Sequence, residues 1–74
     1  MTREEAENKR VFFNRYDHAH VRWKDGSEEE FPLAPPTLEQ LIPFETLYDF
    51  MESAVKDWFP ERATSEIANI RLGG

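Results

Sequence analysis

Two prolines bound the most regular pattern in this sequence, which runs from Pro43 to Phe59. Apolar residues recur there every three or four positions, as they do on one face of an α-helix. Pro43 can occupy the first turn of a helix, whereas Pro60 cannot continue one. The pattern therefore predicts one amphipathic helix over about residues 43–59, which must bury a stripe formed by Phe44, Leu47, Tyr48, Met51, Ala54, Val55 and Trp58.

A strand that could cover this stripe lies earlier in the chain. Ala19, Val21 and Trp23 alternate with polar residues, which gives the period of a strand with one apolar face. Two further apolar residues with the same alternation, Phe31 and Leu33, follow a turn signal. The sequence therefore predicts a β-hairpin that packs its apolar face against the helix.

The turn signal is Asp25-Gly26, and the length of the loop fixes which side chains face each other. A two-residue turn would place carboxylates beside the apolar residues of the first strand. A three-residue loop with Gly26 in the left-handed conformation instead pairs Arg22 with Glu28 and His20 with Glu30. We expect the three-residue loop.

The remaining elements complete an α+β fold. We expect a small antiparallel sheet, a hairpin or meander over about residues 11–33, packed on the main helix as a single domain of residues 11–74. Aromatic and β-branched residues favour a first strand over Val11–Tyr16, and residues 67–72 can add a closing strand or belong to a short helix. Residues 1–10, with a capping-box pattern at Thr2, form a flexible or short helical arm, and Thr37 with Gln40 predicts a second cap.

Charge is distributed unevenly along the chain. The stretch from Asp25 to Glu61 holds ten carboxylates and one base, Lys56, while the flanks are slightly basic. A hydrophobic content of 39% with ten aromatic residues is too high for a disordered acidic tail. We therefore expect a folded domain whose negative electrostatic potential favours basic partners. Such a surface can also serve only to keep a small protein solvated.

Several classes of function lack support in these residues. With three glycines there is no glycine-rich phosphate loop, and no serine, histidine and aspartate order indicates an activated nucleophile, so we expect no enzyme and no cofactor. The absence of cysteine excludes disulfides and favours the cytoplasm, and no apolar run is long enough for a membrane span.

His18 and His20, beside Asp17, form a weak metal-like cluster. Two histidines that are two residues apart on a strand point to the same side, as ligands must. No cysteine or third histidine completes a zinc shell, and a full site would need a distant carboxylate or a second subunit. The sequence therefore predicts no metal site.

The candidate binding residues are the acids that the hairpin does not pair, together with two rings that lie off the apolar stripes. Carboxylates without interspersed bases suit a basic groove made to hold phosphates, and interfaces gain most from a few buried rings. We expect the surface to meet a nucleic-acid-handling enzyme and not nucleic acid itself; the same rings could instead close a homodimer. These residues are Asp25, Glu29, Glu39, Glu45, Asp49, Glu52, Phe13 and Phe50.

In size, acidity and order of elements, the chain resembles small phage-encoded inhibitors of host enzymes, such as RNA polymerase inhibitors and anti-CRISPR proteins. That resemblance implies a non-catalytic inhibitor or modulator, for example of transcription. An antitoxin-like regulator of a basic toxin would share these electrostatics.

The segment Ile70-Arg71-Leu72-Gly73-Gly74 offers another alternative. It resembles the diglycine tail of ubiquitin-like modifiers and of sulfur carriers in the β-grasp family. The resemblance implies a modifier or carrier whose terminal glycine carboxylate is activated by an adenylating enzyme. Those families place further strands between the helix and the tail, which this chain is too short to provide.

Overall fold

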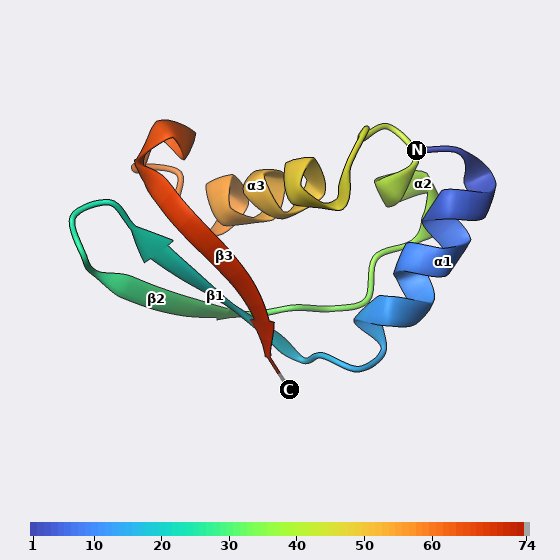
Figure 1. Ribbon diagram of the computed structural model, residues 1–74, viewed down its shortest axis with the longest axis horizontal. Helices are drawn as coiled ribbons and strands as arrows, with labels where there is room; N and C mark the ends of the chain where they lie inside the picture. The colour runs from blue at the N-terminus through green and yellow to red at the C-terminus, as the bar shows by residue number, and fades with distance from the viewer. Residues whose placement is uncertain (74) are drawn as a thin grey trace.

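The expected α+β architecture is confirmed in a computed structural model, which describes residues 1–73. A three-stranded antiparallel sheet carries α3 on one of its faces (Figure 1). None of the helices in this part of the chain has the length and apolar character needed to cross a membrane. The elements in chain order are α1 (Arg3–Phe13), β1 (His18–Trp23), β2 (Glu28–Pro32), α2 (Leu38–Leu41), α3 (Leu47–Trp58), the 3₁₀ turn η1 (Thr64–Glu66) and β3 (Ile67–Gly73).

β1 is the central strand, between β2 and β3, and it runs antiparallel to both. β2 and β3 therefore run in the same direction, and the chain that joins them crosses over β1 and carries α3. This connection covers one face of the sheet, and among residues 1–73 no helix covers the other (Figure 1). The closing strand predicted for residues 67–72 is confirmed.

The hairpin has the three-residue loop that the side chains favour. His20 lies opposite Glu30 and Arg22 lies opposite Glu28. Gly26 has φ +91°, in the left-handed region that glycine adopts without a steric penalty. Its N–H donates to the carbonyl of Trp23 at 3.0 Å, and the N–H of Trp23 donates to Ser27 at 2.9 Å, so the loop is closed from both sides.

The main helix begins later than predicted and is rotated about its axis. Its cap is Thr46, whose hydroxyl accepts the N–H of Asp49, so the helix starts at Leu47 and not at Pro43. Met51 and Val55 are buried as expected, whereas Tyr48 and Trp58 are exposed. The buried face is shifted because Phe50 also packs against the core, whose buried members are Ala6, Phe13, Ala19, Val21, Trp23, Phe31, Leu33, Leu41, Met51, Val55 and Ile67.

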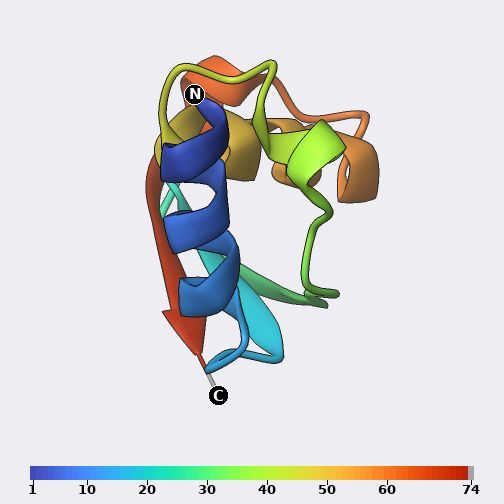
Figure 2. The ribbon, with the colours of Figure 1, turned by 90° about the vertical axis from the view of Figure 1, so that its right-hand side faces the viewer.

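The strand predicted over Val11–Tyr16 is wrong, because Val11 to Phe13 continue α1. Thr2 caps this helix by accepting the N–H of Glu5. Ala6 and Phe13 lie seven residues apart, two helical turns, and both are fully buried. The helix runs across one end of the molecule, from the helical layer down to the sheet (Figure 2). Burial of this face outweighs the β propensity of the local sequence.

Candidate partner-binding site

The predicted acidic residues do not form one surface. Asp25 lies in the hairpin turn and Glu29 on β2, at one end of the long axis of the molecule (Figure 1). Glu39 on α2 and Glu45 in the loop that precedes α3 lie at the other end, with Asp49 in the first turn of α3. The half-buried Glu52 follows one turn later. The fold thus creates two separate acidic regions.

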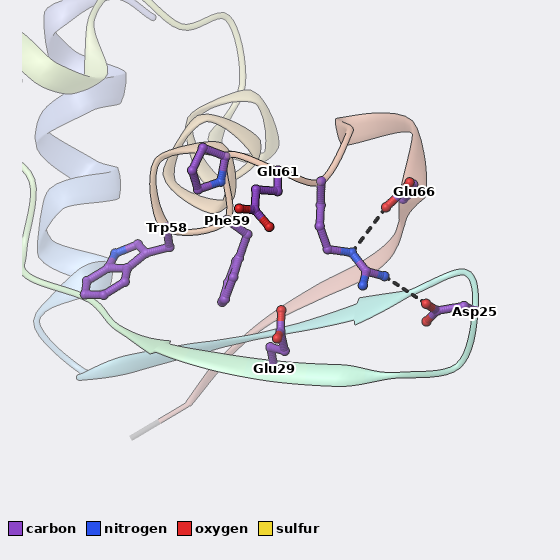
Figure 3. Close-up of a pocket in the computed structure, with 8 residues that line it drawn as sticks. Asp25, Glu29, Trp58, Phe59, Glu61 and Glu66 are labelled. Carbon is purple, nitrogen blue, oxygen red and sulfur yellow. Dashed lines mark hydrogen bonds and ion pairs between the residues drawn. The ribbon is translucent and has the colours of Figure 1, made fainter.

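An open cleft lies at the hairpin end, between the C-terminus of α3 and the sheet (Figure 3). It encloses about 800 Å³. Four carboxylates and one guanidinium line it, together with two aromatic rings and a proline. We call this site the acidic cleft; its lining residues are Asp25, Glu29, Trp58, Phe59, Pro60, Glu61, Arg62 and Glu66.

Arg62, the basic residue that lines the acidic cleft, is already paired within the chain. Arg62 donates from Nη2 to Asp25 at 2.9 Å and from Nε to Glu66 at 3.2 Å. Its guanidinium carbon also lies 4.2 Å from the centre of the Trp23 ring, in cation–π geometry. Lys56 fixes the loop that carries Arg62, because its ammonium donates to the carbonyls of Pro60 and Arg62.

Two of the four carboxylates have internal partners besides Arg62. Asp25 accepts hydrogen bonds from the hydroxyl of Ser27 at 2.5 Å and from its N–H at 2.9 Å. These bonds, followed by the charge of Arg62, hold the pKa of Asp25 below its ordinary value of 3.8. Glu29 accepts the indole N–H of Trp23 at 3.1 Å. Both side chains therefore help to build the acidic cleft as well as line it.

Trp58 and Glu61 are the lining residues that are most available to a partner. Trp58 is 53% exposed and packs one face of its indole on Phe31, with 6.2 Å between ring centres. Phe59, by contrast, turns inward and meets Trp23 and Phe31 edge to face. Glu61 is exposed and has no ion pair or hydrogen bond within residues 1–73. Sequence reasoning missed both residues, since helical periodicity placed Trp58 on the buried stripe.

The two predicted aromatic anchors are not exposed. Phe13 is fully buried, and its ring meets that of Phe50 edge to face at 5.7 Å. Phe50 is half-buried and also meets Phe44, at 5.6 Å. The prediction of Phe13 as an anchor is wrong, because the helical conformation of residues 3–13 turns its side chain into the core. Phe50 packs at the edge of that core and is not a freely exposed ring.

On the uncovered face of the sheet, the structure supplies the distant carboxylate that the histidine pair lacked in sequence. Glu30 lies across from His20, with Oε2 3.5 Å from Nε2, and Asp17 lies 2.5 Å from Nδ1 of His18. At the end of β3, Gly73 lies opposite His18, and its carbonyl accepts the N–H of Asp17. The described part of the diglycine tail is therefore paired within the sheet.

The chemistry that the acidic cleft offers is recognition of a cation. An exposed indole face can attract an ammonium or guanidinium group, and carboxylates in the same cleft can accept hydrogen bonds from such a group. Because the lining has four carboxylates and one guanidinium, which Asp25, Glu66 and Trp23 hold, the acidic cleft has a net negative charge. Comparison with protein-family models, with curated proteins and with solved structures finds no match.

Proposed function

We propose that the protein is a non-catalytic binding module that docks on a basic, nucleic-acid-binding surface of a larger enzyme and inhibits or modulates it. The acidic cleft carries the proposal, because it combines the exposed ring of Trp58 with four carboxylates around one engaged base. An arginine or lysine of the partner would stack on Trp58 and approach Glu61. Surfaces that hold phosphates provide such side chains in number.

Arginine is the side chain that fits this site best. Its planar guanidinium can stack on an aromatic ring and donate to carboxylates at the same time. Arg62 demonstrates the arrangement within the chain itself, since it packs over Trp23 while it donates to Asp25 and Glu66. A partner arginine over Trp58 would repeat that geometry one ring further along the acidic cleft.

An enzyme that handles nucleic acid works inside the cell, so we expect the protein in the cytoplasm. An antitoxin-like regulator would use the same acidic cleft on a basic toxin. Action through the diglycine tail is the weaker candidate, because Gly73 would have to leave β3 and lose its bond with Asp17.

Affinity capture from lysate tests the proposal when it is performed with matched variants. The wild-type chain should retain a nucleic-acid-handling enzyme at low salt and release it as salt rises, since the attraction is electrostatic. The double variant W58A/E61Q should lose the enzyme. The control E4Q/E7Q removes two carboxylates from the exposed surface of α1, one more than W58A/E61Q removes, and it should retain the enzyme.

A second step identifies the surface of the partner. Addition of duplex DNA or RNA should displace the purified wild-type chain from the captured enzyme, because both would occupy the same basic groove. Capture of no such enzyme, or equal capture by W58A/E61Q and wild type, would contradict the proposal.

A further inference from the structure

The uncovered face of the sheet brings together two imidazoles and a carboxylate from neighbouring strands. His18 and His20 project from β1 to the same side, and Glu30 reaches the same place from β2. One ligand atom of each residue lies within 4.8 Å of those of the other two. We propose that His18, His20 and Glu30 bind a transition-metal dication, with Zn²⁺ as the reference ion.

The donor set fits this ion class. Imidazole nitrogen and carboxylate oxygen bind zinc at about 2.0–2.2 Å, and three protein ligands leave a fourth position for water. Tetrahedral ligands at that distance are roughly 3.3 Å apart, so a separation of 4.8 Å between two of the ligand atoms would have to shorten by about 1.5 Å. All three side chains are partly exposed, with His18 and His20 each 32% accessible, so they can make this movement.

Two residues, Asp17 and Gly73, lie against the two ring nitrogens of His18. The carboxylate of Asp17 lies 2.5 Å from Nδ1, an arrangement that orients metal-bound imidazoles and leaves Nε2 as the donor atom. Gly73 lies beside Nε2 on β3, where a Cβ would come within 2.6 Å of that nitrogen. The His18 ring therefore lies close against the backbone of β3, an approach that a side chain at residue 73 would prevent.

The charged groups around the three ligands set the expected strength of binding. Asp17 adds negative charge beside His18. Arg22 donates to Glu28 at 3.1 Å, so this pair is nearly neutral, whereas Arg71 lies opposite His20 on β3 and repels a cation. Three ligands on an exposed face, with the charge of Arg71 opposite His20, should bind zinc more weakly than a closed site with four protein ligands.

Isothermal titration of ZnCl₂ into the chain without any added histidine tag tests the proposal. We expect one ion per chain and at least a tenfold loss of affinity in E30Q. The matched control is E28Q, which removes a carboxylate two residues away on the same strand and the same face. Because this change also frees the charge of Arg22, it should weaken binding, but by less than threefold. H18N and H20N should each weaken binding at least as much as E30Q does.

An independent readout is the NMR spectrum of the two imidazoles during the same titration. Both rings should shift together with zinc in the wild type, and E30Q should need at least tenfold more free zinc to reach half of these shifts. The proposal is overturned if zinc fails to bind at 1 mM, if E30Q binds as tightly as wild type, or if E28Q weakens binding as much as E30Q. The last result would mean that only general surface charge attracts the ion.

Discussion

Replacement of Arg62 by glutamine should lower the free energy of unfolding and at the same time make the charge of the acidic cleft more negative. Glutamine keeps much of the aliphatic stem but loses the charge that packs 4.2 Å from the Trp23 ring. A partly exposed cation–π contact contributes about 0.5–1 kcal/mol. The pair with Glu66, four residues along, adds about 0.3–0.5 kcal/mol after solvent screening. We therefore expect R62Q to lose about 0.8–1.5 kcal/mol of unfolding free energy.

Urea unfolding followed by tryptophan fluorescence measures this loss. With a slope of about 1 kcal/mol/M for so small a domain, the midpoint should fall by about 1 M. The matched control is R3Q, whose ion pair with Glu7 is long at 3.6 Å and exposed, so its midpoint should fall by less than about 0.5 M. An R62Q midpoint equal to wild type, or a loss no greater than that of R3Q, would refute the placement of Arg62 between Trp23 and the carboxylates.

Three further predictions concern the hairpin turn, the packing of α1 in the core and the stability of the fold at low pH. Gly26→Ala should cost about 1–2 kcal/mol in the urea assay, because φ is +91° and no atom crowds the position, so the cost is conformational alone; an unchanged midpoint would contradict the three-residue loop. Phe13→Leu should lower the free energy of unfolding by roughly 1–2 kcal/mol, because Phe13 is fully buried. The same change at the neighbouring Phe12, which is 39% exposed, should cost less than about 0.5 kcal/mol. Equal losses would contradict the packing of α1 in the core. The pKa of Asp25 is lowered in the folded state, so its contribution to stability is complete above pH 3.8 and is lost as pH falls through the folded pKa. Urea midpoints between about pH 5 and pH 2 should therefore fall less steeply in D25N than in wild type. Parallel curves would contradict the hydrogen bonds from Ser27.

Local patterns in the sequence were sufficient for the hairpin and for much of the main helix. Alternation in β1 and the identity of Gly26 determine the register, because a slip of one residue would bury carboxylates. Caps at Thr2 and Thr37 were also recognisable, since each depends on residues only three positions apart. Such short-range signals act through backbone hydrogen bonds and need no knowledge of tertiary contacts.

Long-range packing determined what the sequence could not show. Val11 to Phe13 have strand-like composition, but Phe13 gains more by burial beneath Phe50 as part of a helix. The same contact turns α3 so that Trp58 faces solvent. The acidic residues were recognised as a set, yet their division between the two ends of the molecule depends on where the hairpin and α2 lie in space.

The two indole N–H signals in the NMR spectrum report whether a cationic partner binds at the acidic cleft. Trp58 is exposed at the acidic cleft, while the indole N–H of Trp23 is bonded to Glu29. Addition of an arginine-rich peptide at low salt should shift the Trp58 indole and the backbone signals of residues 58–66, and added salt should reverse both changes. Shifts confined to the other acidic region, around Glu39 and Glu45, with an unchanged Trp58 signal would contradict the acidic cleft as the binding site.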